Sequence, residues 1–229
     1  MREFVELSGV LENRLWGYYS LPGLEGIVPS VEITPIATVS RDDFFASRVS
    51  LSTISGTYVE SGAHILENGR LLDSYNLQDF IRPCSILRLP EQKPQSLIRR
   101  SLLEQFAVYT NPGDALIIDT GWGKQWNKEG YVLSCPNFAL DAIEWIIERQ
   151  PSIFGVDVPC IEGSWSEDDV EEKGGLLGVL FKRGALLVAP LINLWKVPCD
   201  TGVLYCMPLP LTGTSGAPAR VFIETEKDS

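Results

Sequence analysis

NPGDALIIDTGW, residues 111–122, is a turn followed by a short apolar run and a Gly-Trp corner. The opening Asn-Pro-Gly is typical of a turn, because proline and glycine supply the backbone angles that turns need. The run ALIIDT is short, rich in isoleucine and bounded by turn residues, which is typical of a strand buried on both faces. The segment therefore predicts a central sheet strand that ends in a corner at Thr120-Gly121-Trp122.

Further strands are predicted on both sides of this segment. β-branched residues at period two, separated by Gly, Pro and Ser, suit a half-buried sheet. Such runs occupy residues 27–39, 44–54 and 84–90 before the central strand, and 153–159 after it. Residues 203–224 predict two strands around a Gly/Pro/Ser turn. Strands therefore dominate the predicted fold.

Helical spacing of apolar residues indicates three helices. They are predicted over 96–106, 136–150 and the first part of 176–194. Ser96 is the predicted N-cap of the first helix, and Asn137 is the predicted cap of the second, which Pro151 stops. Gly184 is predicted to end the third helix before another buried strand. The pattern as a whole predicts a mixed α/β fold.

Two polar segments bear on domain organisation. The acidic run at 164–175 resembles a solvated loop and helix start, with Ser166 and Asp169 as a capping pair, rather than a cation site. LPEQKPQS, residues 89–96, is the best candidate linker, but the strands on each side are too few for separate cores. The prediction is one domain spanning residues 1–229.

Composition excludes several classes of function. The 229 residues include 30 acidic and 19 basic ones, and the resulting net charge of −11 argues against a nucleic-acid partner. No signal-like leader and no apolar stretch long enough to span a membrane is present, so no membrane partner is expected. The five cysteines form no CxxC pair, which indicates a reducing cytoplasm and free thiols. With a single histidine, clustered zinc ligands are not expected.

ISGTYVESGAH, residues 54–64, contains that histidine. In an extended chain, side chains at alternate positions share one face, so Tyr58, Glu60 and His64 would lie together, with Ile54 at the start. The glycine at 56 and the one at 62 would leave that face open. A carboxylate can orient an imidazole for proton transfer, and a phenol can donate a hydrogen bond to a developing oxyanion. The pattern predicts His64 as acid/base, Glu60 as its orienting group and Tyr58 as the oxyanion donor.

Each of these residues also has a possible purely structural role. A lone histidine at a strand end is commonly a surface or hydrogen-bonded residue, tyrosine is common in strands, and the glutamate would then be solvated. Cys160 follows a predicted strand end, but no second histidine exists to activate its thiol. Ser215 and Arg220 flank the closing turn, where serine more often supports the turn than attacks a substrate.

Several segments together resemble the "putative cyclase" family, which includes bacterial kynurenine formamidase and isatin hydrolase. Residues 54–64 align with the family signature HxGTHxDxPxH, and GDALIIDTGW resembles its central strand and corner. GVDVP at 155–159 is similar to the family's GIDxxS strand, and residues 183–194 and 208–222 match its closing strands. The resemblance implies a single α/β domain with a mixed β-sheet core, of the swivelling β/β/α kind, and outer helices.

The resemblance also implies a divalent metal site, whose ligand positions fall here on Ile54, Tyr58, Glu60, Leu177 and Ala189. Only Glu60 could still contact a cation, and one carboxylate with a phenol is too few ligands for a catalytic ion. No metal and no other cofactor is therefore expected. The family's final histidine, an acid/base group there, falls on His64.

The resulting hypothesis is a metal-independent cyclase or hydrolase acting on a small cyclic or aromatic amide, lactone or carbonyl compound. The predicted substrate-binding residues are Trp16, Ile54, Gly56, Thr57, Trp122 and Leu177. The alternative is a relative that lost catalysis with its metal and now binds a small molecule or acts as a scaffold. A third reading, with metal bound elsewhere, is weakened by the scarcity of histidine. The resemblance implies a homodimer or homotetramer.

Overall fold

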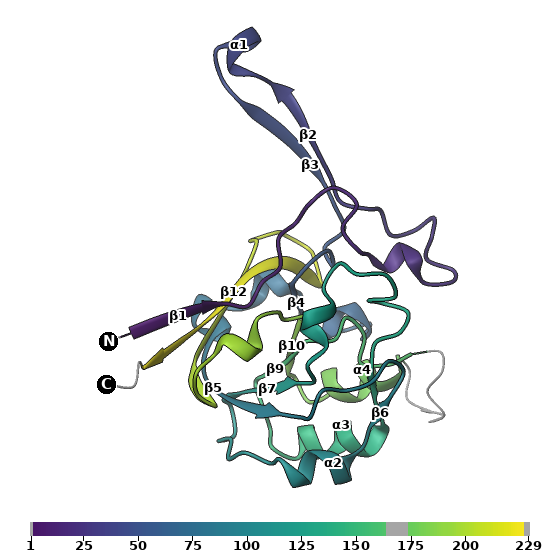
Figure 1. Ribbon diagram of the computed structural model, residues 1–229, viewed down its shortest axis with the longest axis vertical. Helices are drawn as coiled ribbons and strands as arrows, with labels where there is room; N and C mark the ends of the chain where they lie inside the picture. Colours follow the sequence, from purple (N-terminus) through teal and green to yellow (C-terminus); the bar gives the residue numbers. More distant parts are fainter. Residues whose placement is uncertain (1, 164–173, 227–229) are drawn as a thin grey trace.

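The computed structural model describes residues 2–163 and 174–226. Its centre is one eight-stranded mixed sheet in the order β1-β12-β11-β5-β7-β9-β10-β4 (Figure 1). An additional pairing between β12 and β4 joins the sheet into a ring, so the core is barrel-like. The strands are β1 (Arg2–Glu6), β4 (Tyr58–Glu60), β5 (Ile81–Arg88), β7 (Ala115–Asp119), β9 (Ile153–Val156), β10 (Leu186–Ala189), β11 (Thr201–Pro208) and β12 (Gly216–Glu226).

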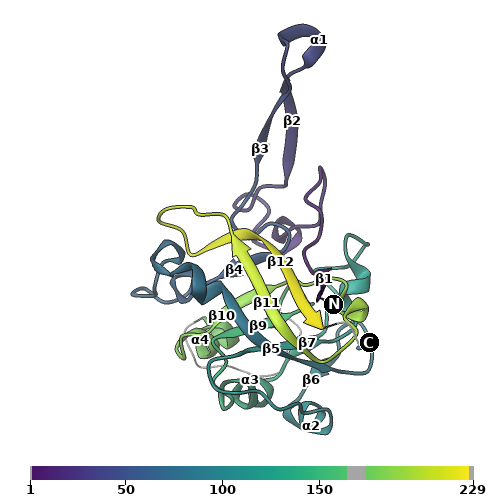
Figure 2. The same ribbon diagram turned by 90° about the vertical axis from the view of Figure 1, so that its left-hand side faces the viewer.

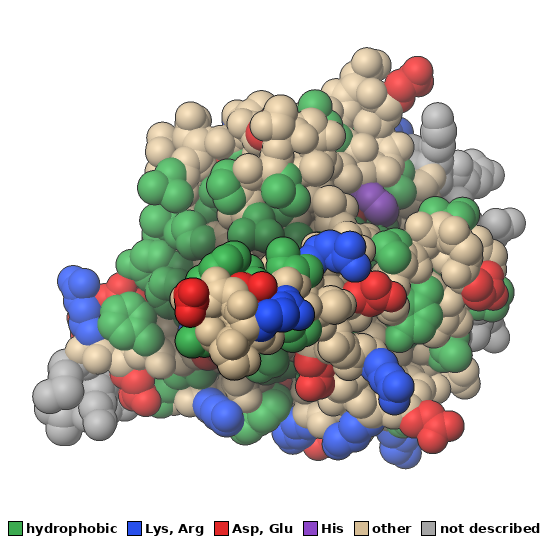
Figure 3. All heavy atoms as spheres, turned by 90° about the horizontal axis from the view of Figure 1, so that it is seen from above, with side chains coloured by type: hydrophobic (Ala, Val, Ile, Leu, Met, Phe, Trp, Pro, Cys, Tyr) green, Lys and Arg blue, Asp and Glu red, His purple; other side chains and the backbone are tan. Residues whose placement is uncertain are grey.

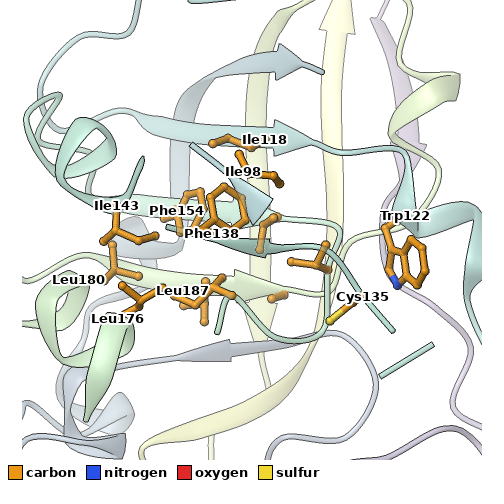
Figure 4. Packing of buried hydrophobic residues seen from close by; sticks show 14 of the residues in the cluster. Ile98, Ile118, Trp122, Cys135, Phe138, Ile143, Phe154, Leu176, Leu180 and Leu187 are labelled. Carbon is orange, nitrogen blue, oxygen red and sulfur yellow. The ribbon is translucent and has the colours of Figure 1, made fainter. Parts of the chain in front are cut away.

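The predicted central strand is confirmed as β7, which pairs in parallel with β5 on one side and β9 on the other. All five of its residues are buried. Ala115 and Ile117 pack in one hydrophobic cluster, whereas Leu116 and Ile118 pack in a second cluster on the opposite face. Figure 4 shows Ile118 in this second cluster, beside Phe138 and Phe154. A strand apolar on both faces is therefore what the fold requires here.

Three helices cover the outer face of the sheet (Figure 1). They are α2 (Arg100–Gln105), α3 (Leu140–Ile147) and α4 (Gly175–Phe181), and a short α1 (Val39–Asp42) lies apart from them. Ala142, Ile143, Trp145 and Ile146 of α3 are buried, so this helix presents one apolar side to the sheet. The observed mixture of strands and outer helices in a single domain is the fold that the sequence predicts.

The starts of α2 and α3 correct the prediction. Ser96 and Asn137 are not caps; the residues that precede the two helices are Arg99 and Ala139, without a side-chain cap. The reason is a long-range pairing, because β6 (Leu97–Ile98) and β8 (Asn137–Phe138) form a small parallel sheet immediately before the two helices. Gly184 does follow α4 as predicted, with a positive φ of 81° that suits glycine.

A two-stranded arm extends from the body of the protein (Figures 1 and 2). It consists of β2 (Glu32–Ala37) and β3 (Ala46–Ser50), which pair only with each other among the described strands. Large apolar side chains on the arm and its tip are more than half exposed: Ile36, Val39, Phe44, Phe45 and Val49. The arm is therefore an apolar element without a covering layer in the single chain.

The predicted linker at 89–96 separates no domains, since β5 before it and β7 after it are neighbours in one sheet. The predicted capping pair Ser166–Asp169 lies outside the described residues. No helix in the described ranges is long and apolar enough to cross a membrane.

Asp157 fixes the corner that follows β7. Its carboxylate accepts hydrogen bonds from the backbone N–H and the hydroxyl of Thr120, at 3.0 and 2.7 Å, and from the backbone N–H of Gly123 at 3.0 Å. The side chain is almost completely buried. Burial, with a contribution from Asp119, raises the pKa of Asp157 to about 7. The backbone turn at residues 120–123 therefore depends on the buried Asp157 carboxylate as its hydrogen-bond acceptor.

Replacing Asp157 with alanine is expected to destabilise the fold by about 2–4 kcal/mol, because three buried donors lose their acceptor. Urea denaturation measures the change. Asp200→Ala is the control: it removes an exposed carboxylate paired with Arg88, and such a pair contributes less than about 1 kcal/mol. Equal losses in the two variants would contradict this role of Asp157.

Candidate active site

A cavity of about 840 Å³ lies on the outer face of the sheet, where the N-terminal segment covers β4 and the ends of β9 and β10. Its walls are mostly apolar, and its polar groups are concentrated near β4 and β9. The lining residues are Tyr18, Leu21, Pro22, Leu24, Ile27, Val28, Ile54, Tyr58, Glu60, His64, Val132, Leu133, Cys135, Asn137, Pro159, Cys160, Ile161, Glu162, Gly163, Leu177 and Leu187. The single histidine is visible at the surface in Figure 3.

Strand β4 directs two of the predicted residues into the cavity. Tyr58 and Glu60 line it, whereas Val59, between them, packs on the opposite face of the sheet. The extended chain ends at Glu60, and residues Gly62–His64 form a 3-10 turn. This turn places Nδ1 of His64 3.1 Å from Oε1 of Glu60. Tyr58, Glu60 and His64 do meet in one cavity, although a turn rather than strand alternation places the histidine.

Burial makes the Glu60–His64 pair unusual. The Glu60 side chain is only 2% exposed, and this burial raises its carboxyl pKa from 4.5 to about 8. Burial lowers the pKa of the His64 imidazole, whose side chain is 32% exposed. Both changes favour neutral groups at pH 7. The pair then consists of a carboxylic acid 3.1 Å from an uncharged imidazole. In this geometry the contact is not a formed hydrogen bond, and the buried Oε1 of Glu60 has no other hydrogen-bond partner among the described residues.

A buried tyrosine pair forms a second polar element of the cavity. The hydroxyl of Tyr18 donates a hydrogen bond to the Pro159 carbonyl at 2.5 Å and lies 2.8 Å from the hydroxyl of Tyr58. Because Tyr18 has a single hydroxyl proton, Tyr58 must be the donor in the second contact. Burial raises both tyrosine pKa values well above 10. In this arrangement the Tyr58 proton points to Tyr18 rather than to a substrate oxygen.

The other predicted substrate-binding residues divide into two groups. Ile54 and Leu177 line the cavity. Gly56 and Thr57 do not: Gly56 has a positive φ of 67°, and the Thr57 hydroxyl donates to the Pro190 carbonyl at 2.7 Å. Thr57 therefore ties β4 to the segment after β10.

The two predicted tryptophans are core residues rather than cavity walls. Trp16 packs edge-on against Tyr18, Trp126 and Tyr131. The indole N–H of Trp122 donates to the Tyr131 carbonyl at 3.0 Å. The aromatic side chain that reaches the cavity from this region is Tyr18, two residues after Trp16.

Ser215 and Arg220 lie outside the cavity lining. The Ser215 carbonyl accepts hydrogen bonds from the backbone and side chain of Ser61, and Arg220 forms an exposed ion pair with Glu6. These contacts of Ser215 are therefore structural and are made by its backbone carbonyl.

Five lining residues with polar or ionisable side chains were not predicted as part of the site, although Cys160 was considered: Tyr18, Cys135, Asn137, Cys160 and Glu162. The first lies in the same N-terminal segment as Trp16, and the aromatic pattern RLWGYY does not tell which ring faces inward. The other four are brought together by packing of distant segments.

The described lining contains carboxyl side chains but no lysine or arginine. Glu60 and Glu162 are its two carboxyl groups. Glu162 accepts a hydrogen bond from the backbone N–H of Leu176 at 2.9 Å. An anionic ligand would therefore find no compensating cation in the described lining, and burying an unpaired charge is costly.

The donor set does not fit the divalent ion that the family resemblance implies. Ile54 and Leu177 supply only aliphatic groups, Ala189 supplies a methyl, and the Tyr58 hydroxyl is bonded to Tyr18. Glu60 and His64 remain, one fewer than the three protein ligands of a typical catalytic zinc. Within residues 2–163 and 174–226, no group of three or more His, Cys, Asp or Glu is arranged to hold an ion. No catalytic step is therefore assigned to a metal here.

Comparisons with known proteins agree with the fold. The family model described as "Putative cyclase" matches residues 5–163. "Cyclase-like protein 1" of Arabidopsis thaliana is 25% identical over 196 residues, which cover 82% of this chain and 73% of the relative.

Two solved structures share the fold. An isatin hydrolase bound to the product analogue thioisatinate has a TM-score of 0.85 at 20% identity and covers 99% of this chain and 93% of its own. A protein described as a potential metal-dependent hydrolase with cyclase activity has a TM-score of 0.78 at 20% identity, covering 100% of both chains. With the family model spanning most of the sequence, this chain belongs to the "Putative cyclase" family.

Proposed function

We propose that this protein is a metal-independent hydrolase or cyclase that acts on an uncharged cyclic or aromatic amide, lactone or carbonyl compound. The observation that carries the proposal is the 3.1 Å contact between His64 and the buried Glu60 at the wall of a large apolar cavity. The family and its hydrolase and cyclase relatives support the reaction class.

His64 is the proposed acid/base group. In the proposed reactive arrangement the Glu60 carboxyl turns its proton to Nδ1, 3.1 Å away. The neutral imidazole then carries its own proton on Nε2, from which it is given to a leaving group or carbonyl oxygen. Transfer of the Glu60 proton to Nδ1 then keeps the ring uncharged. Above the Glu60 pKa of about 8, the carboxylate instead accepts a hydrogen bond from Nδ1–H and leaves Nε2 as a base.

Tyr58 is proposed to stabilise the carbonyl oxygen of the substrate. Its hydroxyl lies at the cavity and 2.8 Å from that of Tyr18. To donate to substrate, Tyr58 must turn its proton away from Tyr18, whose own proton remains on the Pro159 carbonyl. Tyr18 therefore competes with the substrate for the Tyr58 proton.

The second candidate function is binding without catalysis. It is favoured by the aliphatic side chains of Ile54 and Leu177, which occupy positions where the family resemblance places ligands and make the cavity more apolar. A binder would retain the cavity but gain nothing from the Glu60–His64 proton.

A paired panel of compounds tests the proposed function. Neutral aryl amides, lactams and lactones are incubated with the protein at pH 7, each beside an analogue that carries a carboxylate. We expect turnover of neutral members, with kcat/KM at least about tenfold higher than for the anionic partners, because a buried anion finds no cation in the described lining. Turnover that disappears with a chelator and returns with a divalent ion would contradict metal independence. Tight binding without turnover across the panel would favour the binder.

The chain is also proposed to form a homodimer or homotetramer. The exposed apolar residues of the β2–β3 arm support a second copy as its partner, because uncovered apolar surface on an unpaired edge favours association. Light scattering coupled to gel filtration measures the mass; a monomer at micromolar concentration would contradict the proposal.

A cytoplasmic location is proposed on the ground that Cys84, Cys135, Cys160, Cys199 and Cys206 are free thiols.

A further inference from the structure

Two thiols share one wall of the cavity. Cys135 lies just before β8 and Cys160 lies after β9, and both line the cavity. The Cys135 thiol is placed to donate to the Val132 carbonyl oxygen at 3.3 Å and to the Cys160 carbonyl oxygen at 3.7 Å. The second of these contacts places the Cys135 sulfur directly against Cys160. Residues far apart in the sequence thus bring the Cys135 sulfur against Cys160 at one wall of the cavity.

The surroundings of Cys135 lower the pKa of its thiol. The side-chain amide of Asn137 donates to the Cys160 carbonyl at 2.9 Å and lies 3.6 Å from Sγ of Cys135. Hydrogen bonds to Cys135, from the Cys160 thiol first and from Asn137 as well, lower the pKa of the Cys135 thiol. The same contact raises the pKa of Cys160, which keeps its proton. A thiol of lowered pKa beside a second thiol is an arrangement that oxidants can convert to a disulfide.

We propose that Cys135 and Cys160 form an oxidisable dithiol site that hydrogen peroxide or an organic hydroperoxide converts to an intrachain disulfide. The Cys135 thiolate attacks one peroxide oxygen, the O–O bond breaks, and a sulfenic acid forms as hydroxide leaves and takes up the Cys160 proton as water. The Cys160 thiolate then attacks the Cys135 sulfur, the S–S bond forms, and hydroxide leaves and is protonated by solvent. In total, two thiols and one hydrogen peroxide give one disulfide and two waters.

The other three cysteines provide a contrast within the same chain. Cys84 and Cys206 are buried away from the cavity lining, and burial raises their pKa values to about 12. Cys84 does lie near Cys199, but the Cys199 thiol donates to the Thr201 carbonyl at 3.1 Å instead. Cys84–Cys199 is therefore a comparison pair outside the cavity lining, in which burial outweighs the backbone hydrogen bonds that lower the pKa of the Cys84 thiol.

Peptide mapping of the full chain tests the proposal without any substrate, so its outcome is independent of the proposed function. Reduced protein is treated with a small molar excess of hydrogen peroxide, blocked with N-ethylmaleimide, digested and analysed by mass spectrometry with and without reductant. We expect a reductant-sensitive cross-link between the peptides that contain Cys135 and Cys160. The same cross-link is expected in Cys199→Ser and is lost in Cys135→Ser and Cys160→Ser.

Two results would overturn the dithiol site. One is a wild-type map in which Cys135 and Cys160 remain alkylated after peroxide treatment. The other is a cross-link that joins Cys84 to Cys199, or two chains, in place of the expected pair. Because the wild-type map decides the question, poor folding of either cavity variant leaves the test intact.

Discussion

Replacing His64 with alanine is expected to lower kcat on a neutral substrate by about 10²–10⁴-fold, the usual contribution of a positioned acid or base. His64 is the only histidine in the chain, so no second imidazole can substitute for it. Its side chain is partly exposed and caps no helix, so the fold should tolerate the change. The measurement is steady-state kinetics on the best compound of the panel, with thermal unfolding to verify folding.

Leu133→Ala is the control for this loss. Leu133 lines the same cavity and is 49% exposed, so its truncation alters the wall without touching the proton-transfer pair. We expect a change in KM with kcat nearly preserved. Unchanged turnover in the His64 variant, or equal kcat losses in both variants, would show that His64 is not the acid/base group.

The second large effect concerns stability rather than rate. Glu60→Gln is expected to stabilise the protein at pH 9 by about 2–4 kcal/mol, because the neutral amide replaces a carboxylate that must ionise while buried. The folded-state pKa of about 8 exceeds the ordinary value of 4.5, so the folded protein holds this proton across the interval between them. Wild-type stability therefore falls as the pH rises through that interval, and the advantage of the variant grows over the same range.

Urea denaturation at pH 5 and pH 9 measures the effect. Near pH 5 both side chains are neutral and the two proteins should differ little. Glu162→Gln is the matched control, because it replaces the second carboxyl of the cavity and keeps an oxygen for the Leu176 N–H. A glutamine at position 60 that destabilises the protein at pH 9 would instead indicate a carboxylate held by a cation.

Local sequence patterns were sufficient to predict the strands that position the site. Period-two alternation correctly placed Tyr58 and Glu60 on one face, and the apolar run before Thr120 correctly indicated a buried strand. The resemblance of residues 54–64 to the family signature predicts His64 as a site residue, and His64 does line the same cavity. These features depend on short stretches of chain, whose side-chain direction follows from backbone geometry.

Features that depend on distant segments were missed. The β6–β8 pairing shortens α2 and α3 at their starts, and neither dipeptide, Leu97–Ile98 or Asn137–Phe138, indicates its partner 40 residues away. The 3-10 turn at Gly62–His64, rather than a continued strand, brings His64 to Glu60. The Cys135–Cys160 contact likewise arises from tertiary packing. The alternation rule describes a strand but does not say where it ends.

The interior of the cavity explains why its ionisable groups could not be assigned from composition. Glu60 resembles many solvated glutamates in sequence, and only its burial in the described structure raises its pKa. The sequence favours Trp16 over Tyr18 as the cavity aromatic, because both rings are large and only two residues apart. The tertiary structure determines that Tyr18 lines the cavity while Trp16 packs against it in the core.

The sole imidazole offers the most direct test of the Glu60–His64 pair. Untagged protein labelled with ¹⁵N-histidine has one set of ring signals, which needs no assignment because His64 is the only histidine. A titration by NMR is predicted to show a pKa below 6.5 and, at pH 7, a neutral ring with its proton on Nε2. A pKa above 6.5, with the ring still charged at pH 7, would mean an ordinary ion pair with an ionised Glu60 and would contradict the account.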